Sequence, residues 1–473
     1  MSSNGLSHKP IPGTEGPAEN CVMQDTRVKA PYAELNLVTE VCGADEAHAK
    51  GFAGEGPLPL PEATFSGLEG LREEHFDLVI VGAGLSGAVL AERCTKELGM
   101  KVLILDKREH IGGNCYDYID EYGIRVSLYG VHLFHTKFAR VWEYVNKFSE
   151  WVPYEHRVKA RVDDIRGDFK VIPVPPVQEA VNTLFDANVH SEEEMEAWLE
   201  ARRPKIDEPA NGEEAALKRV GPELYEKIFK HYTKKQWDKY PEELDASVLA
   251  RIPCRVNTDD RYFGDQWQAL PRRGYTRIFD NMLLFNEAIT IRLNVDYFAV
   301  KDQLPKHDLL VFTGPIDAFY ASKGLPKLEY RSLRFEREYH EPDSGYYQEA
   351  LQMNYPGPFV PYTRITEYKH KPTQPESVRG IKGTVIYKEY STDEGDPYYP
   401  VPNPENHALY EKYREMAEQE PGVAFVGRLA SYKYFNMDQA ILNALEIYDN
   451  LKETGKLAPK RRPEDFGPGD GPK

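Results

Sequence analysis

The fold class of this chain is set by the stretch Phe76-Asp77-Leu78-Val79-Ile80-Val81-Gly82-Ala83-Gly84-Leu85-Ser86-Gly87. Its first six residues are mostly apolar and predict a buried strand, and the glycines that follow predict a turn into a helix that reaches about Leu98. Residues 101–106 form a second, mostly apolar run and predict the next strand. Because a β-α-β unit needs only about 30 residues, we expect an α/β fold that begins with a Rossmann-like domain.

The turn in this stretch has the pattern G-x-G-x-x-G, formed by Gly82, Gly84 and Gly87 around Leu85. Glycines at this spacing let the backbone approach a pyrophosphate at the N-terminus of a helix. Asp106 ends the second strand 19 residues after Gly87, where a carboxylate can accept hydrogen bonds from ribose hydroxyls. This context predicts a dinucleotide site rather than a glycine turn that serves packing alone.

A second glycine pair indicates which dinucleotide is bound. Gly112 and Gly113 closely follow Asp106, whereas NAD-binding Rossmann domains usually continue there into a helix. A Gly-Gly pair at this place is similar to FAD-binding folds related to amine oxidases, in which the backbone lies close to the cofactor. The sequence therefore favours FAD over NAD.

Length, charge and cysteine content limit the classes of protein to which this chain can belong. The 473 residues exceed one ordinary domain of about 100–200 residues. The 59 basic and 76 acidic residues give a net charge of −17, which argues against a nucleic-acid or anionic-membrane surface but not against an anionic small molecule. We see no secretory signal, no apolar run of about 20 residues and no C-x-x-C spacing among the five cysteines. A cytoplasmic protein without a membrane span, a disulfide framework or a metal site is expected.

Helix signals recur further along the chain. Ser191 and Glu194 have the spacing of a capping box, and Pro222 is expected in the first turn of a helix over 222–235. Asn436, with Gln439 three residues later, predicts the start of a final helix. Residues 289–300, 309–313 and 384–390 are predicted as strands, and 202–214 as a connecting loop.

The region from Phe76 to about Leu451 resembles the bacterial UDP-galactopyranose mutase family. The matching motifs are HIGGN (110–114), YGVHLFHT (129–136), YTKKQW (232–237), RIPCR (251–255), PYTRI (361–365), DPYYPV (396–401) and GRLASYKYFNMDQ (427–439). The resemblance implies an enzyme that interconverts UDP-galactopyranose and UDP-galactofuranose without net redox change, through an adduct between the sugar and N5 of reduced FAD (FADH⁻). It also implies an external reductant, such as NAD(P)H or a reductase, and a homodimer.

The resemblance completes the expected domain organisation. It implies a Rossmann-like FAD-binding domain with an inserted helical domain and an antiparallel β-sheet domain. We expect a flexible extension (1–75), the first part of the FAD core (76–160), a helical insert with uridine-binding residues and a mobile loop (161–255), an antiparallel substrate domain interleaved with the core (256–420), a return to the FAD domain (421–455) and a flexible tail (456–473).

The substrate-binding residues are implied by these motifs. Arg251 and Arg364 match two arginines that bind the diphosphate and assist its departure, since a guanidinium fork suits phosphate oxygens. Tyr232 matches the tyrosine that stacks on uridine. Further substrate contacts are expected from His156, Thr233, Trp237, Tyr262, Asn354, Glu389, Tyr399, Arg428 and Tyr434. Tyr398 is expected to point elsewhere, because neighbouring residues of an extended segment alternate in direction.

The flavin-binding residues come from three motifs. Gly113 and Asn114 belong to HIGGN, and His132, Leu133 and His135 belong to YGVHLFHT. His135 is the candidate for tuning flavin N5 or assisting proton transfer. Arg428 is expected between FAD and substrate. Asn436 and Met437 start the final helix, whose N-terminus can stabilise an anionic reduced flavin.

Some residues depart from the family pattern and leave alternatives open. Val131 stands where many relatives have Ala, Asn436 where they have Asp, and His156 where some have Asn. The same chemistry on another UDP-sugar, such as UDP-N-acetylgalactosamine, is therefore an alternative. A second alternative, from another class, is an amine-oxidase-like FAD oxidoreductase.

Overall fold

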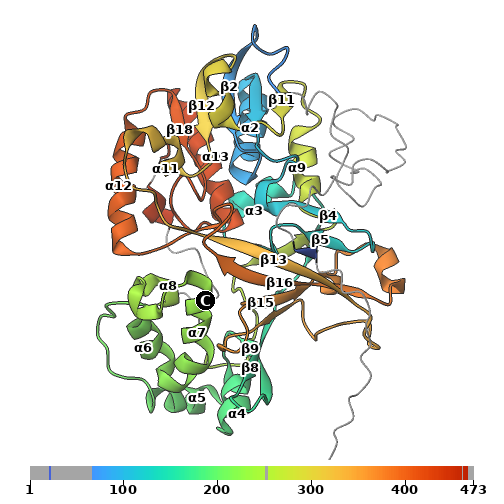
Figure 1. The fold of residues 1–473 in the computed structure, drawn as a ribbon, viewed down its shortest axis with the longest axis vertical. Coiled ribbons are helices and arrows are strands. Elements are labelled where there is room, and N and C mark those ends of the chain that lie inside the picture. Colours follow the sequence, from blue (N-terminus) through green and yellow to red (C-terminus); the bar gives the residue numbers. More distant parts are fainter. Residues whose placement is uncertain (1–20, 23–66, 251–253, 461, 467–473) are drawn as a thin grey trace, which may run out of the picture.

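The structure is a computed structural model that describes residues 21–22, 67–250, 254–460 and 462–466. Figure 1 shows three parts along the long axis: a parallel sheet covered by helices, a larger mixed sheet, and a group of helices. Arg251 and most of the expected extension lie outside the described residues. Among the described helices, none is long and apolar enough to cross a membrane.

The parallel sheet is the predicted Rossmann-like core. Its strand order is β11-β3-β2-β12-β18, and every neighbouring pair is parallel. The strands are β2 (His75–Val81), β3 (Val102–Leu105), β11 (Ile289–Arg292), β12 (Lys306–Phe312) and β18 (Val423–Phe425). The chain thus leaves this sheet twice, after β3 and after β12, and the other two parts are formed largely during these excursions.

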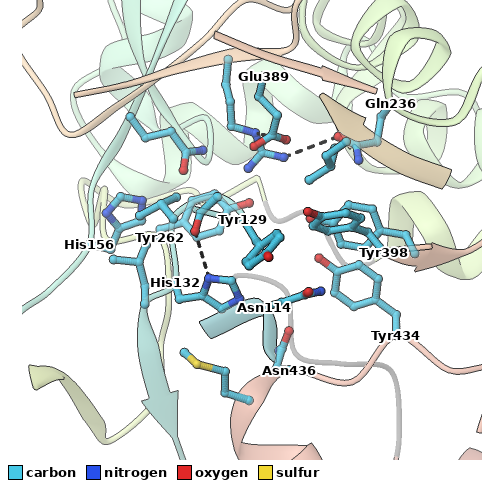
Figure 2. Close-up of a pocket in the computed structure, with 18 of the residues that line it drawn as sticks. Asn114, Tyr129, His132, His156, Gln236, Tyr262, Glu389, Tyr398, Tyr434 and Asn436 are labelled. Carbon is cyan, nitrogen blue, oxygen red and sulfur yellow. Dashed lines mark hydrogen bonds and ion pairs between the residues drawn. The ribbon is translucent and has the colours of Figure 1, made fainter. Parts of the chain in front are cut away.

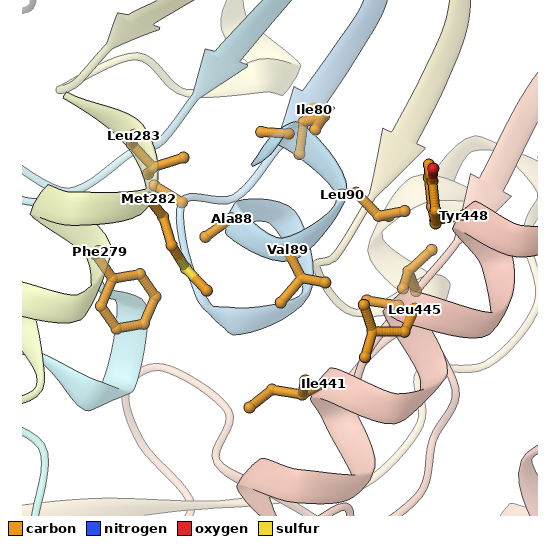
Figure 3. Close-up of a cluster of buried hydrophobic side chains, with 14 of the residues drawn as sticks. Ile80, Ala88, Val89, Leu90, Phe279, Met282, Leu283, Ile441, Leu445 and Tyr448 are labelled. Carbon is orange, nitrogen blue, oxygen red and sulfur yellow. The ribbon is translucent and has the colours of Figure 1, made fainter. Parts of the chain in front are cut away.

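Helices α2 (Leu85–Leu98) and α13 (Met437–Thr454) pack together against this sheet, with α9 (Thr276–Leu283) beside them. Figure 3 shows their contact, in which Ile80 and Leu90 are fully buried and Leu445 is nearly so. The predicted start of α13 is confirmed: Asn436 is its N-cap, and the Asn436 N–H donates to the Gln439 Oε1 atom at 3.1 Å. An early helix and the last α-helix of the described chain therefore share one hydrophobic core.

The larger sheet has the strand order β1-β13-β16-β15-β14-β8-β9, and β17 also pairs with β13. Only β14 and β8 pair in parallel; the other pairs are antiparallel. The strands are β1 (Cys21–Val22), β8 (Val158–Asp163), β9 (Phe169–Val174), β13 (Tyr330–His340), β14 (Gln352–Asn354), β15 (Arg364–Glu367), β16 (Thr384–Thr392) and β17 (Tyr399–Pro400).

Smaller elements connect these parts. Two small antiparallel sheets join β6 (Phe134–Thr136), β10 (Trp267–Pro271) and β7 (Trp151–Pro153), and β4 (Asp117–Ile119) with β5 (Arg125–Ser127). The remaining α-helices outside the helical group are α3 (Ala139–Val145), α10 (Tyr297–Val300), α11 (Ile316–Phe319) and α12 (Pro404–Glu418).

The helical group contains α4 (Gln178–Phe185), α5 (Glu192–Glu200), α6 (Gly212–Leu224), a π-helical turn (Tyr225–Lys230), α7 (His231–Trp237) and α8 (Ala246–Ala250). Ser191 caps α5 by accepting from the Glu194 N–H, as predicted. Gly221 has a φ of 75° that interrupts α6, so the helical chain restarts at Pro222, as expected for a first-turn proline. The predicted loop over 202–214 ends earlier, because Asn211 caps α6.

The structure corrects three expectations. Residues 289–300 do not form one strand: β11 ends at Arg292, and the Asp296 carboxylate caps α10 by accepting from the Phe298 N–H. Leu68 and Leu71 of the expected flexible extension are buried. Leu457 and Phe466 of the expected flexible tail are also buried. Isolated apolar residues among Pro and Gly produce no periodicity, so the sequence pattern missed these contacts.

We expect the docked tail to contribute to stability. The Phe466 ring packs edge-to-face on Phe435 with centroids 5.2 Å apart. Phe466→Ala should lower the free energy of unfolding by about 3 kcal/mol through lost burial, measured by urea unfolding. Phe359→Ala is the control, since Phe359 is 50% exposed, and should change it by less than about 0.5 kcal/mol. Equal effects of the two substitutions would contradict the docking.

Candidate active site

Two cavities meet between the parallel sheet and the larger sheet. The first, which we call the glycine cavity, has a volume of about 420 Å³ and is lined by Gly82, Gly84, Asp106 and Gly113 among others. The second, the tyrosine cavity, has a volume of about 280 Å³ and lies against α7 and the strands β15 and β16. Both are lined by Asn114, His132, Tyr398, Arg428, Asn436 and Met437, so these residues form the junction between them.

Backbone geometry explains the glycines of the first cavity. A Cβ atom at Gly87 would lie 2.0 Å from the Gly82 carbonyl oxygen, so Gly87 is required for packing and does not line the cavity. Gly113 has a φ of 54°, and a Cβ there would lie 2.9 Å from the Gly84 Cα atom. Gly84 is different, because its φ of −82° suits any residue and its Cβ would contact only Gly113, at 3.7 Å. A ligand close to the backbone therefore accounts for Gly84 better than packing does.

Asp106 is held at the edge of the glycine cavity. Its carboxylate accepts hydrogen bonds from the Ala83 N–H at 2.8 Å and the Arg108 N–H at 2.9 Å. Burial raises the pKa of Asp106, and these two hydrogen bonds oppose that shift. The helix α2 begins beside it with Gly84 as N-cap, which has no side chain to bond the first amide groups of the helix. This is the geometry that binds a dinucleotide phosphate.

His132 lies at the junction of the cavities. Its Nδ1 atom is 2.9 Å from the Gly130 carbonyl oxygen, and because a carbonyl can only accept, Nδ1 carries the hydrogen. Burial lowers the pKa of His132 to about 4. The imidazole is therefore neutral at neutral pH, and its Nε2 atom is a hydrogen-bond acceptor.

The tyrosine cavity contains a half-buried positive charge. Arg364 on β15 faces Glu389 on β16 across the sheet, with 3.0 Å between Nε and Oε1, and its Nη2 atom lies 3.5 Å from the Gln236 Oε1 atom. Burial by itself lowers the pKa of Arg364, but Glu389 and the neighbouring tyrosine hydroxyls together raise it, and the net pKa is raised. Burial raises the pKa of Glu389, with Arg364 opposing.

A stacked pair of tyrosines stands opposite. The rings of Tyr399 and Tyr434 have centroids 5.2 Å apart and are inclined by 15°. The Arg428 guanidinium lies 4.9 Å from the centre of the Tyr434 ring and donates from Nε to the Phe435 carbonyl oxygen at 3.0 Å. Arg428 thus presents positive charge at the junction, next to two phenolic hydroxyls.

Helix α7 forms one wall of the tyrosine cavity. Tyr232, Thr233 and Trp237 line it, and the Trp237 ring meets the Tyr399 ring edge-on at 6.4 Å. Tyr262 and His156 line the same cavity, and Figure 2 shows the two side chains close together. Burial lowers the pKa of His156 to about 3, so this imidazole is neutral as well.

The structure brings most of the predicted residues together, with five differences, one of which is that Leu133 lines the tyrosine cavity and not the glycine cavity. Arg251 lies outside the described residues. Gly87 packs against the Gly82 carbonyl and does not line the glycine cavity. Asn354 does not line either described cavity: it sits opposite Arg364 in the sheet and accepts from Gln352, which does line the tyrosine cavity. His135 lines only the tyrosine cavity, where its Nδ1 atom contacts the Asp265 carboxylate and its ring stacks on Phe263 at 3.7 Å.

Several lining residues were missed. Tyr398 lines both cavities, against the expectation that it points elsewhere. Strand β17 contains only Tyr399 and Pro400, so the strand alternation does not extend to Tyr398. Gln236 lies inside the YTKKQW motif, so the motif could have identified it as a substrate-site residue. Phe263 and Gln352 have no local signal, since distant strand pairing places them.

Two family models match this chain. The model for UDP-galactopyranose mutase matches residues 227–434, and a model for an NAD(P)-binding Rossmann-like domain matches residues 80–148. Among solved structures, the crystal structure of reduced UDP-galactopyranose mutase resembles this fold with a TM-score of 0.62 at 18% identity, over 80% of this chain and 94% of that chain. That likeness bears on the fold alone.

Curated relatives extend over most of the chain. A probable UDP-galactopyranose mutase of Klebsiella pneumoniae is 40% identical over 380 residues, which is 79% of this chain and 94% of the relative. A dTDP-fucopyranose mutase of Escherichia coli is 39% identical over 376 residues, 78% of this chain and 96% of the relative. The resemblance inferred from the motifs is confirmed, and this chain belongs to the UDP-galactopyranose mutase family of isomerases.

Proposed function

We propose that this protein is an FAD-dependent mutase that interconverts the pyranose and furanose forms of a nucleotide sugar, with UDP-galactose as its substrate. The observation that carries this proposal is the junction of the two cavities. A dinucleotide cradle on one side meets, at Arg428, a cavity that holds Arg364 and two phenolic hydroxyls on the other. This arrangement suits a diphosphate that must be bound and also released as a leaving group.

The glycine cavity supports FAD as the cofactor. The open space next to Gly84 and the close approach of Gly113 leave room for a pyrophosphate against the backbone, and Asp106 is placed to accept from a ribose. When bound in its reduced form, FAD supplies a nucleophilic nitrogen, N5. The N-terminus of α13, at Asn436 and Met437, presents its positive dipole end to the junction, where it stabilises negative charge.

The residues of the tyrosine cavity then have distinct tasks. Arg364 and Arg428 hold the diphosphate and stabilise its charge as the bond to the anomeric carbon breaks. The hydroxyls of Tyr399 and Tyr434 donate to the same phosphates, and Tyr232 stacks on the base. Neutral His132 offers Nε2 to accept a hydrogen bond from a sugar hydroxyl at the junction, because Nδ1 is occupied by the Gly130 carbonyl.

The relatives leave more than one candidate for the sugar nucleotide, because they are named for different substrates. The relatives at 40% and 39% identity are named for UDP-galactopyranose and dTDP-fucopyranose. dTDP-fucopyranose is thus a second candidate substrate, beside UDP-N-acetylgalactosamine. All three fit the same chemistry, since each provides a nucleoside diphosphate leaving group on an anomeric carbon.

Product analysis tests this function. The holoenzyme is reduced with dithionite and incubated separately with UDP-galactofuranose, dTDP-fucofuranose and UDP-N-acetylgalactosamine, and isomers are separated by chromatography. We expect pyranose product from UDP-galactofuranose, formed fastest, and little product without reduction. Release of hydrogen peroxide in air, with no isomer formed from any of these substrates, would contradict a mutase function and indicate an oxidase.

The role of Arg364 gives a second prediction. Arg364→Ala should lower kcat/KM by about 100- to 1,000-fold because it removes the charge that stabilises the departing diphosphate. Bound FAD, quantified by absorbance, should be retained. Arg379→Ala, at an exposed arginine outside both described cavities, is the matched control and should leave the rate unchanged. Normal turnover in Arg364→Ala would remove this residue from the mechanism.

The cofactor site gives a third prediction. Gly84→Ala should fold normally, because its φ and its protein neighbours tolerate a Cβ, yet it should weaken FAD binding by at least about tenfold through a clash with the ligand. Titration of apoprotein with FAD, followed by flavin fluorescence, measures this. Gly380→Ala is the control, since a Cβ there meets open space. Undiminished FAD affinity in Gly84→Ala would place the cofactor elsewhere.

A further inference from the structure

One lysine outside the proposed chemistry joins the helical group to the larger sheet. Lys235 lies on α7, between Tyr232 and Trp237, and is half-buried. Its ammonium group donates hydrogen bonds to three backbone carbonyl oxygens: those of Tyr355, of Tyr362 at 3.0 Å and of Val360 at 3.3 Å. An ammonium has three donors, so all three are satisfied by one short segment.

That segment, residues 355–362, is the proline turn that connects β14 to β15. It contains Pro356, Pro358 and Pro361, which have no N–H group and cannot form a regular ladder with a neighbouring strand. The carbonyls of Tyr355, Val360 and Tyr362 therefore take a donor from outside the segment. Lys235 provides that donor, and burial lowers its pKa to about 8, so the group still carries its charge at neutral pH.

The proline turn leads directly into Arg364. The Tyr355 N–H bonds the Thr363 carbonyl at 2.9 Å, and the Thr363 N–H bonds the Glu389 carbonyl at 2.8 Å, so the end of the turn fixes the start of β15. The residue after Lys235 is Gln236, whose Oε1 atom lies 3.5 Å from the Arg364 Nη2 atom. Its carbonyl accepts from Ser391 on β16 at 2.5 Å. Two consecutive residues of α7 thus contact the segment that leads into Arg364 and the Arg364 guanidinium.

We infer that Lys235 is a positioning residue: by clamping the proline turn to α7, it aligns Arg364 with the α7 side chains so that a diphosphate can be bound between them. Lys235 itself does not line the tyrosine cavity. The clamp acts on the relative position of two walls of the cavity, one on α7 with Tyr232 and one on β15 with Arg364. The inference rests on the proposed function only in taking a nucleoside diphosphate as the ligand.

The test measures UDP binding to the oxidised holoenzyme by calorimetry, with no turnover. Lys235→Met should raise the Kd for UDP by about tenfold, while FAD content stays unchanged. Lys235→Arg, which keeps several donors for the carbonyls, should recover the affinity to within about threefold. The matched control is Lys234→Met, since Lys234 is on the same helix but its ammonium contacts Asp238 and the Tyr240 ring and makes no described bond to the proline turn. It should change Kd by less than about twofold.

A double-mutant cycle separates positioning from a general loss of structure. In an Arg364→Ala background, Lys235→Met should add less than about a twofold change in Kd, because the group that it positions is gone. A full tenfold effect in that background, or no effect in the wild-type background, would overturn the inference. Absence of isomer formation by the wild-type enzyme would overturn the proposed function alone, because UDP binding is measured without catalysis.

Discussion

The structure depends on the parallel pairing of β2 along both of its edges. β3 flanks it on one side, close in sequence, and β12 on the other, from more than 200 residues further along the chain. Because parallel strands end at the same edge of a sheet, this pairing places the glycine turn after β2 next to Asp106 after β3 and Thr313 after β12. β18 extends the sheet from β12 and delivers Arg428 to the same edge.

The long excursions of the chain from this sheet build the second cavity. The excursion after β3 forms the helical group, and that after β12 forms most of the larger sheet, including Arg364 and Glu389. An ion pair between a half-buried arginine and a buried glutamate is weak evidence for stability, because desolvation opposes the Coulomb attraction. The position of this pair beside a cavity is consistent with a positive charge on Arg364 that binds a ligand. Glu389 holds the guanidinium in place, and Gln236 contacts its other side.

The two excursions must also be held against each other, and polar contacts do this. The α7 segment reaches the sheet through the ammonium of Lys235 and the carbonyl of Gln236. Arg331 on β13 adds a second bond to that carbonyl at 3.4 Å. These bonds are directional, so they fix the angle between the walls of the tyrosine cavity more tightly than apolar packing alone would.

Local patterns predicted much of this protein. The glycine turn, the capped start of α13 and the family motifs name the glycines, arginines and tyrosines on which the proposed function rests, and the capped start of α5 was also predicted. Local patterns failed where a distant partner decides the outcome. Phe466 carries no periodic signal, yet it packs on Phe435. Residues 289–300 look uniformly strand-like, but Asp296 caps a helix within them. Of the two histidines in one motif, the favoured His135 bonds Asp265, and His132 occupies the junction.

By itself, the sequence determined the Rossmann-like start, the dinucleotide turn and the family, because these depend on residues close together in the chain. Only the tertiary structure decided that Tyr398 lies between the cavities, that Asn354 stands behind Arg364, and that Lys235 clamps the proline turn. Each of these depends on strands or helices that are far apart in sequence and meet only when the sheets are complete. Their positions follow from register and packing, which no local pattern records.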